Sequence, residues 1–571
     1  MKYRYKEISP LDTIKNISEY LLGLGLYIKH EWFNSNVKNI FSVRISIYGT
    51  NYGANGKGIN KEYALASAYG ELIERIANGI IFKNNELLKT HDIGFIYFPD
   101  EINISEEYYS NIKNEIVDGI LNIVVNDKYN TCKQKLTKKE AMDLWKKYEI
   151  KNDWISIPFK RETDGKIYYV PYKMMKVYGS NGMSAGNSYN EAFVQACSEI
   201  FERYCQINII ENNLCPPIIS RNMIELHFKE ISDIISEIEL DNNFYVEFRD
   251  CSLNKGFPVV CVCIYDKQKH TEIVSFGAHP NIEIAMERAL TEAFQGRNKQ
   301  NVCNNIENRN KDKRLNISSL LKNGIGYYPY LFYSNKESYC CKTKEFFKKF
   351  ANNNELKNEI LRICKNNKLN IYVHSVILMN MSCLQIIIPG LSEVFCYDNF
   401  QFQYKEMKEK TKIILSNIDK QSFTSIEAAL EFIDYSRKIA EFDFNLSKEI
   451  LVDDYDAANQ EALWILINGF IYLGKYDRAI AYLRLSSYKE SISGKCLIKF
   501  LELLLNNIDL NTAKYILNKF FEKKYVDSAM DILFQSKDTI KNLHTFKMST
   551  NKDDAKFLSV VKEIKKGIRV I

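Results

Sequence analysis

Two stretches of the sequence each carry a pair of glutamates separated by one helical turn. Glu71 and Glu74 stand in SAYGELIER, and Glu199 and Glu202 stand in SEIFER. Residues three apart lie about 60° from each other around an α-helix, so the two carboxylates of a pair face the same side. Like charges at this spacing weaken a helix by about 0.2–0.5 kcal/mol. Their recurrence therefore indicates a function such as cation binding rather than helix stability.

Both pairs keep the same register with small residues. The pattern G-x5-A-x3-A-x2-E-x2-E-R begins at Gly58 and again at Gly186, and a weaker third copy, A-x3-A-x2-E-x2-Q, ends with Glu292 and Gln295. Alanines four residues apart form a stripe that allows close packing against a sheet or another helix. The structural alternative is a solvated face on which each arginine pairs with its own glutamates. That alternative gives the acids no reason to keep register with packing alanines.

Carboxylates that converge from three helices provide the ligands that hard cations prefer. Magnesium takes oxygen ligands and usually keeps substrate phosphates in its coordination shell. Arg75 and Arg203 follow the two glutamate pairs, and Arg288 precedes the third copy's glutamate. Guanidinium groups neutralise phosphate charge, so the pattern predicts a magnesium-dependent site for a phosphorylated ligand.

Conventional nucleotide-binding signatures are missing from the sequence. GANGKG (53–58) has the composition of a P-loop but lacks the spacing G-x-x-x-x-G-K-[ST]. The small residues of NGKG (55–58) and of SNGMSAGN (180–187) still predict loops that approach a nucleotide closely.

The elements that must position these residues alternate between β and α periodicity. Strands are expected at 41–48, 168–171, 243–248, 258–265 and 384–389, and helices at 61–80, 190–211 and 282–296. The polar stretch 300–315 is expected to be a surface loop. Residues 1–404 are therefore predicted to form an α+β or α/β enzyme domain, and we take α+β, with the internally repeated helices on β-sheets, as the prediction.

From about residue 405 the pattern becomes helical to the end of the chain, without a proline. Residues 468–480 are typical of the turn between the two helices of a tetratricopeptide (TPR) repeat. Ala479 and Ala513 keep the period of that repeat, but a third copy places Lys547 at the small position. Residues 405–571 are predicted to form an all-α, TPR-like domain of two or three degenerate repeats, with an unrelated helical bundle as the alternative.

Length and composition narrow the class of protein. A chain of 571 residues, 46% hydrophobic and 26% charged, is typical of a globular protein with two or three domains. A net charge of +6 without a dense basic stripe argues against direct nucleic-acid binding. The start resembles no secretory signal, no long apolar run predicts a membrane span, and the 14 cysteines lack metal-binding spacing. The expected location is the cytoplasm, with the cysteines acting as small hydrophobic residues.

At these motifs the sequence resembles the YcaO family. The motifs that carry the resemblance are SAYGELIER (67–75), SNGMSAGN (180–187), SEIFER (198–203), FGAHP (276–280), RALTEAFQGR (288–297), KEISPLDTI (6–14) and PGLSEVF (390–396). The resemblance implies a YcaO-type nucleotide fold without a P-loop, in which acidic helices bind magnesium-bridged ATP. It extends to the TPR-like segment, because a member of the family carries such a domain at its C-terminus.

The resemblance also implies roles for individual residues. The expected magnesium ligands are Glu71, Glu74, Glu199, Glu202 and Glu292. The expected nucleotide contacts are Lys6, Thr13, Arg75, Ser184, Asn187, Glu191, Arg203 and Arg288, with Thr13 standing where the family pattern has Ser. The expected catalytic residues are Glu202, Arg203 and Gln295.

The family resemblance implies a reaction as well. Members phosphorylate the oxygen of a backbone amide with ATP, and a neighbouring side chain or a sulfur donor then attacks to give an azoline or a thioamide. The chain ends without the proline-rich terminus of many peptide-cyclising members, and we expect no additional leader-binding domain. These features favour an ATP-dependent, amide-activating accessory factor for β-methylthiolation of the twelfth protein of the small ribosomal subunit.

The expected partners are a protein or peptide substrate, such as that ribosomal protein, and a sulfur-transfer or methylthiotransferase protein, with a homodimer left open. Two other functions stay open. One is a maturase that makes azolines or thioamides in a ribosomally made peptide. The other is a TPR-like scaffold with a vestigial ATP site. The acids of all three copies argue against the scaffold, because an unused site has no reason to keep unfavourable like-charged pairs.

Overall fold

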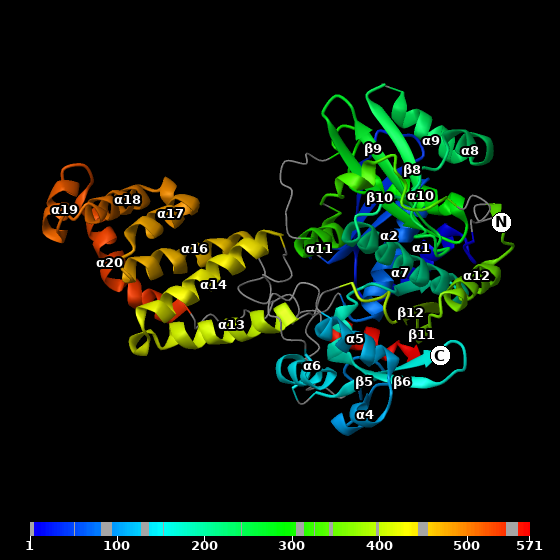
Figure 1. Cartoon of the computed structure of the whole chain (residues 1–571), viewed down its shortest axis with the longest axis horizontal. Helices are drawn as coiled ribbons and strands as arrows, with labels where there is room; N and C mark the ends of the chain where they lie inside the picture. The colour runs from blue at the N-terminus through cyan, green and yellow to red at the C-terminus, as the bar shows by residue number, and fades with distance from the viewer. Residues whose placement is uncertain are drawn as a thin grey trace. The chain divides into compact units, whose positions relative to one another are not determined.

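The computed structural model describes residues 5–570 except 51, 81–93, 127–135, 152, 241, 304–312, 325, 342–346, 395–398, 443–454 and 544–557. The chain forms two compact units (Figure 1). One comprises Met1–Asp398 together with Lys552–Ile571, and the other comprises Asn399–Asn551. The first unit mixes helices with β-sheets, as predicted, and the described residues of the second are helical.

The described part of the first unit contains three antiparallel sheets. Their strand orders are β1-β2-β3, β10-β9-β8 and β4-β5-β11-β12-β7, with β6 on β5 and β13 on β11. The strands are β1 (Ile28–Asn34), β2 (Phe41–Ile47), β3 (Gly53–Gly58), β4 (Ile102–Asn103), β5 (Ile155–Arg161), β6 (Ile167–Pro171), β7 (Met183–Gly186), β8 (Phe244–Asp250), β9 (Val259–Asp266), β10 (Thr271–Ala278), β11 (Tyr372–Leu378), β12 (Met381–Ile387) and β13 (Arg569–Val570). Strands β3, β7 and β10 each end a sheet, and each leads into one of the repeat helices.

The three repeat helices are α2 (Lys61–Ala77), α7 (Tyr189–Glu211) and α10 (Ile282–Ala293). All three begin in the same way. The side chains of Asn60, Ser188 and Asn281 each accept a hydrogen bond from the backbone N–H three residues later. This cap satisfies one of the free donors in the first turn of a helix. The internal repeat of the sequence is therefore a repeated strand–cap–helix unit.

The remaining helical elements of the first unit are α1 (Pro10–Gly23), α4 (Glu106–Asn111), α5 (Glu115–Val125), α6 (Lys138–Trp145), η1 (Lys146–Ile150), η2 (Tyr172–Val177), α8 (Arg221–His227), α9 (Lys229–Glu239), α11 (Lys313–Asn323), η3 (Tyr330–Tyr333), α12 (Asn353–Asn366) and α22 (Leu558–Lys566).

Strand β9 shows how the core divides between the repeat helices. Val260, Val262 and Ile264 pack in one apolar cluster with α9 and α10, whereas Cys261 and Cys263 pack in another with α7 and α12. Alternate residues of a strand point to opposite faces of its sheet. The described cysteines are all free, and most are buried, which is the role expected for them as small hydrophobic residues.

The C-terminal segment corrects the predicted domain limits of 1–404 and 405–571. Residues 552–571 belong to the first unit, where β13 pairs with β11, and Figure 1 shows the chain end beside that strand. Lys565 of α22 donates hydrogen bonds to the backbone carbonyl oxygens of Ile96 and Tyr97. Strand pairing and burial hold this segment on the first unit. Its helical periodicity in the sequence indicated neither.

We expect removal of residues 552–571 to destabilise the first unit, whereas replacing residues 399–551 with a flexible linker leaves it folded. Val561, Ile564 and Ile568 are all buried, and burying one aliphatic side chain contributes about 1.5–3 kcal/mol. The free energy of unfolding of the truncated chain should fall by about 4 kcal/mol or more, measured by urea denaturation. An equal loss in the linker variant would show that the second unit stabilises the first.

The described residues of the second unit form helices, several of which are connected by short turns. They are α13 (Asn399–Ser416), η5 (Ile418–Lys420), α14 (Phe423–Phe442), α16 (Tyr455–Tyr472), α17 (Tyr476–Leu485), η6 (Ser487–Glu490), α18 (Ile492–Leu505), α19 (Leu510–Leu517) and α20 (Lys523–Leu543). The predicted turn lies between α16 and α17, where Gly474 has a φ of 67°. Ala479 and Ala513 are buried on α17 and α19, and Lys547 lies outside the described residues.

Every predicted strand and helix of the first unit is present, with ends shifted by a few residues. Two expectations need correction. Residues 55–58 and 183–186 are strands rather than loops. The expected loop 300–315 ends earlier, because α11 begins at Lys313, and residues 304–312 lie outside the description. None of the described helices combines the length and apolar character needed to cross a membrane.

Candidate nucleotide site

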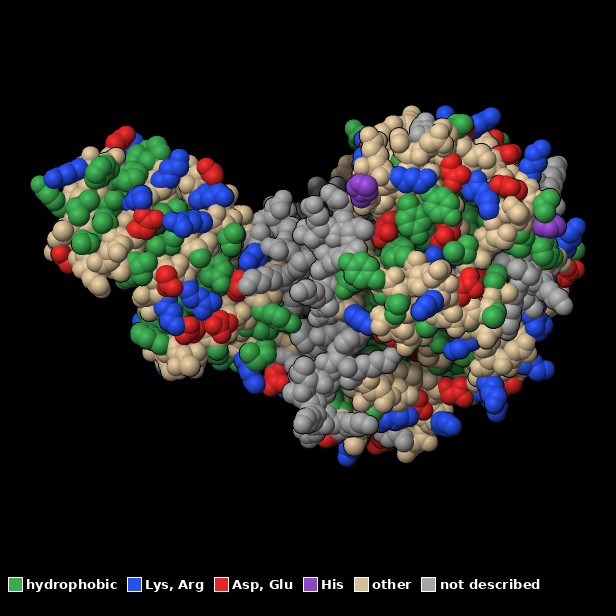
Figure 2. All heavy atoms as spheres, turned by 45° about the horizontal axis from the view of Figure 1, so that its top comes forward, with side chains coloured by type: hydrophobic (Ala, Val, Ile, Leu, Met, Phe, Trp, Pro, Cys, Tyr) green, Lys and Arg blue, Asp and Glu red, His purple; other side chains and the backbone are tan. Residues whose placement is uncertain are grey.

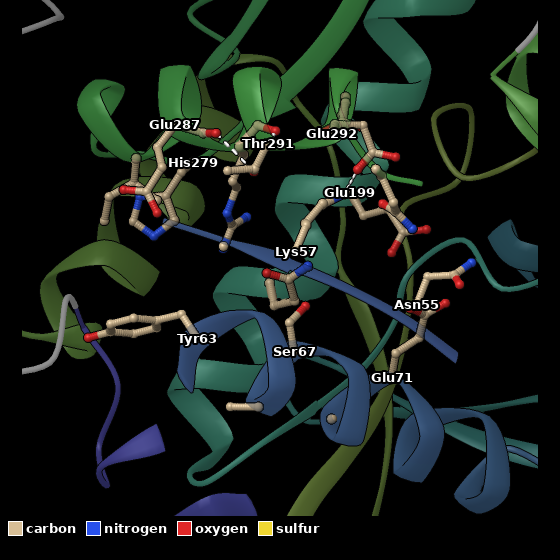
Figure 3. A pocket seen from close by; sticks show the side chains of 18 of the residues that line it. Asn55, Lys57, Tyr63, Ser67, Glu71, Glu199, His279, Glu287, Thr291 and Glu292 are labelled. Carbon is tan, nitrogen blue, oxygen red and sulfur yellow. Dashed lines mark hydrogen bonds and ion pairs between the residues drawn. The ribbon is translucent and has the colours of Figure 1, made fainter. Parts of the chain in front are cut away.

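The three repeat units surround one cavity in the first unit. Helix α2 packs against β3 and β7, α7 against β7 and β10, and α10 against β10 and β3. Each helix therefore contacts its own edge strand and the edge strand of another copy, so the arrangement closes into a ring. Figure 3 shows side chains from α2, α7 and α10 pointing into the space between them.

The cavity has a volume of about 740 Å³. The predicted magnesium ligands from all three copies line it, namely Glu71, Glu74, Glu199, Glu202 and Glu292. Gln295, which follows α10, lines it as well. The register of the acids with the packing alanines thus corresponds to convergence on one cavity rather than to a solvated face. Of the structural alternative, only the pairing of arginines with glutamates of their own helix is present.

Ion pairs hold several of these carboxylates at the cavity wall. Arg203 lies 2.8 Å from Glu199, and Arg75 pairs with Glu71 in the same i, i+4 geometry. The side chains of Glu199 and Glu71 are only 21% and 28% exposed. Two of the arginines predicted to contact phosphate, Arg75 and Arg203, are therefore already in the cavity, paired with acids.

The acids lie in an environment that disfavours their charge. Burial, and then the nearby charges of Glu199 and Glu71, raise the pKa of Glu74 well above its ordinary value. Burial also raises the pKa of Glu199 and of Glu202. A carboxylate that has lost solvation beside other carboxylates gains most from a cation. The electrostatics therefore favour a cation-binding site.

Two further basic groups line the cavity, one on β3 and one on α10. Lys57 of β3 forms an ion pair with Glu292 (Figure 3), and burial lowers its pKa. Burial also lowers the pKa of Arg288 to about 10, and its Nη1 donates to the carbonyl oxygen of Ala278 at 2.8 Å. Sequence reasoning missed Lys57; the only signal was a lysine between two glycines directly before an acidic helix.

The N-terminal segment brings the other predicted nucleotide contacts together. Lys6 Nζ lies 2.9 Å from Glu191, whose second carboxylate oxygen accepts the backbone N–H of Glu7 at 3.1 Å. Thr13 Oγ1 lies 3.3 Å from Asn187 Oδ1. Four of these residues, Lys6, Thr13, Asn187 and Glu191, line the same cavity. The motif at residues 6–14 and the start of α7 therefore form a second group of polar side chains facing the space.

Ser184 is the predicted contact that the structure does not bring into the cavity. It is fully buried on β7, and its hydroxyl donates to the backbone carbonyl of Ala192 at 2.8 Å. The residue therefore joins strand β7 to helix α7. Its neighbour Ala185 lines the cavity instead, because alternate strand residues face opposite sides.

His279 is a second cavity residue to which sequence reasoning gave no role. Its Nδ1 accepts the backbone N–H of Asn281 at 3.0 Å, which leaves Nε2 to carry the proton of the neutral ring. Burial, and then the charge of Arg288, lower the pKa of His279 well below its ordinary value. The imidazole is therefore a neutral donor at the cavity wall, where Figure 3 places it.

The donor set fits a magnesium-bridged phosphate in type. Carboxylate oxygens and one amide are the ligands that magnesium takes, and the arginines match phosphate oxygens. Among the described residues, no three His, Cys, Asp or Glu side chains are gathered closely enough to hold a metal as they stand. Since Glu71, Glu199 and Glu292 are each paired with a basic side chain, a metal must replace some of these ion pairs. The individual assignments stay predictions.

Comparisons with known proteins agree with this donor set. A family model described as "YcaO cyclodehydratase, ATP- and Mg2+-binding" matches residues 55–392. The chain is 27% identical over 420 residues to an uncharacterized protein of Haemophilus influenzae, covering 72% of this chain and 70% of that one. It is 33% identical over 300 residues to the ribosomal protein S12 methylthiotransferase accessory factor YcaO of Escherichia coli. That match covers 51% of this chain and about half, 49%, of the relative.

Part of the chain is also similar, at low sequence identity, to solved structures. YcaO from Methanopyrus kandleri bound with AMPPCP and Mg2+ has a TM-score of 0.42 and 16% identity, over 68% of this chain and 93% of that one. A heterocyclase in complex with substrate and cofactor has a TM-score of 0.47 and 15% identity, over 68% of this chain and 53% of that one.

Proposed function

Because the chain belongs to the YcaO family of ATP- and Mg2+-binding cyclodehydratases, we propose that its cavity uses ATP to phosphorylate the oxygen of a backbone amide. The observation that carries the proposal is the convergence of five glutamates from three repeated helices on one cavity, with arginines among them. ATP and magnesium are the cofactors of the family. The finer step, amide activation, is our inference.

The residues of the cavity divide into roles under this proposal. Glu71, Glu74, Glu199, Glu202 and Glu292 hold magnesium. Arg75, Arg203 and Arg288 neutralise phosphate charge, and Lys6, Thr13, Asn187 and Glu191 position the nucleotide. When bound, ATP supplies the phosphoryl group that turns a poor amide leaving group into a good one. Glu202, Arg203 and Gln295 are the proposed catalytic residues, because fixed polar and charged groups stabilise the transferred group as charge develops.

The proposed substrate is a protein, most consistently the twelfth protein of the small ribosomal subunit. The E. coli relative is named as an accessory factor for methylthiolation of that protein, although the match spans only about half of its length. The family description, cyclodehydratase, supports a second candidate, an azoline- or thioamide-forming maturase of a ribosomally made peptide. ATP hydrolysis measured with the ribosomal protein and with a cysteine-rich peptide separates the two, because only a substrate amide should raise the rate.

The second unit is the proposed docking part, with a TPR-like arrangement. What supports this is the helix pair α16–α17 and the 34-residue interval between the buried Ala479 and Ala513. Tyr515, Phe520 and Phe534 are exposed on this unit, and Figure 2 shows hydrophobic side chains among charged ones on its visible face. A protein substrate or a methylthiotransferase partner is the proposed occupant.

The ATP site is tested by nucleotide binding. We expect ATP to bind the wild-type chain only with magnesium present, and Lys6→Met to weaken that binding at least about tenfold, since a lost charged hydrogen bond costs about 1.5–3 kcal/mol. Lys15→Met is the matched control, because Lys15 is exposed on α1 and lines no part of the cavity. Calorimetric titration of both variants gives the result. A wild-type chain that binds ATP equally well without magnesium would contradict the proposed function.

A further inference from the structure

Lys57 places its ammonium group among carboxylates of all three repeat helices. Its Nζ forms an ion pair with Glu292 of α10, and Figure 3 shows the side chain rising from β3 toward that helix. Glu71 of α2, and Glu199 and Glu202 of α7, line the same cavity. Burial, and the like charge of Arg288, lower the pKa of Lys57, and these three carboxylates act in the opposite direction. One lysine therefore faces four of the five glutamates assigned to magnesium.

The backbone around Lys57 leaves its side chain no other direction. A Cβ atom on Gly56 would lie 2.0 Å from the carbonyl oxygen of Ala64, and one on Gly58 would lie 2.8 Å from the nitrogen of the same residue. This face of β3 is pressed against the start of α2. Because side chains alternate along a strand, Lys57 and Asn55 project from the opposite face, and both line the cavity.

The charge at this position is not needed for packing. The repeat aligns Lys57 with Ala185 of β7 and Ala278 of β10, each seven residues before the first alanine of its copy. Those two strands also lead into their helices through an N-cap and close contact with the helix. Two copies of the same unit therefore fold with alanine at the position where the first copy has lysine. The charge of Lys57 is thus not required for the unit to fold.

We propose that Lys57 is an internal counter-cation, which offsets part of the carboxylate charge of the cavity without nucleotide and makes magnesium binding depend on ATP. The inference rests on the proposed ATP site. Free magnesium has to displace the ammonium from Glu292 and then bind beside it, against the repulsion of like charges. ATP relieves both costs, because its phosphate oxygens provide the ammonium with a new partner. Magnesium thus enters together with the nucleotide rather than before it.

The test measures metal binding without nucleotide, using Mn2+ as the probe and electron paramagnetic resonance to count free ion. We expect Lys57→Ala to bind Mn2+ at least tenfold more tightly than the wild type when no nucleotide is present. Lys57→Arg keeps the charge and should bind like the wild type. With a non-hydrolysable ATP analogue present, the advantage of Lys57→Ala should disappear. Lys15→Ala controls for the loss of a lysine elsewhere on the chain.

The outcomes separate the two proposals. If Lys57→Ala binds free Mn2+ no more tightly than the wild type, while the wild type still binds the analogue with Mn2+, the role assigned to Lys57 is wrong and the ATP site stands. If the wild type binds no analogue with Mn2+, the ATP site itself is wrong. The urea midpoint of each variant verifies folding, and Lys57→Gln repeats the measurement with a side chain of similar length.

Discussion

Replacing Glu202 with glutamine is expected to lower the rate of ATP hydrolysis at least about 100-fold, the loss typical of removing one group that stabilises transition-state charge. Glu202 lines the cavity on α7, and burial raises the pKa of its carboxyl. Glutamine keeps the size of the side chain but removes the negative charge that a magnesium ligand supplies. Glu71→Gln, on helix α2, should also lower the rate of ATP hydrolysis.

Glu225→Gln is the matched control for this prediction. Glu225 stands on α8, pairs with Arg221 at 3.0 Å in the i, i+4 geometry, and lies outside the cavity. Surface pairs of this kind contribute at most about 1 kcal/mol, so its hydrolysis rate should stay within about twofold of the wild type. If Glu202→Gln and Glu71→Gln both bind and hydrolyse magnesium-ATP as the wild type does, the assignment of these acids to the metal is wrong.

The helices of the site could be predicted from the sequence, because the spacing of their glutamates and alanines is a local property of the chain. Glutamates three residues apart and alanines four apart share a face of any α-helix, so α2, α7 and α10 followed from the sequence. The recurrence of one pattern in three places indicated that the helices do the same work. The three helices form a ring in which each packs on two edge strands. This arrangement could not be predicted, because no local sequence pattern indicates which strand a helix will contact.

Ser184 and Lys57 lie in segments that were predicted to be loops but are strands. The directions of their side chains therefore could not be predicted correctly. Residues 55–58 and 183–186 are rich in glycine and small residues, which removes the alternation of apolar and polar residues that marks a strand. Once they are strands, Ser184 faces the helix and Ala185 faces the cavity. Lys57 points into the cavity by the same rule. The family resemblance assigned Ser184 to the nucleotide and left Lys57 without a role.

The C-terminal segment could not be placed from the sequence for a different reason. Strand β13 comprises only Arg569 and Val570, too few residues to show a period of two. Its partner β11 is nearly two hundred residues earlier in the chain, and long-range pairing leaves no local signal. The helical pattern of α22 was visible, but nothing in it distinguishes a helix of the second unit from one that returns to the first.

Replacing Gly277 with alanine is expected to lower the free energy of unfolding of the first unit by about 3 kcal/mol or more. This is at or above the upper end of the range of about 1–3 kcal/mol that an added methyl group typically costs in a well-packed core. A Cβ atom there would lie 2.2 Å from the carbonyl oxygen of Ala285 and 2.5 Å from the nitrogen of Ala289. Both contacts are with the backbone of α10, which cannot rotate away as a side chain can. Strand β10 and helix α10 must therefore separate.

Gly23→Ala is the control, because no atom lies within 4 Å of a Cβ at that position, and its effect should stay within about 1 kcal/mol. Urea denaturation of both variants measures the difference. The same displacement moves Glu292 away from the carboxylates of α2 and α7, so Gly277→Ala should also lose magnesium-dependent ATP binding under conditions where it is still folded. A variant that unfolds at the wild-type midpoint would mean that β10 and α10 are not packed this closely, and the close strand–helix contact that makes the acids converge would then be absent from the third repeat.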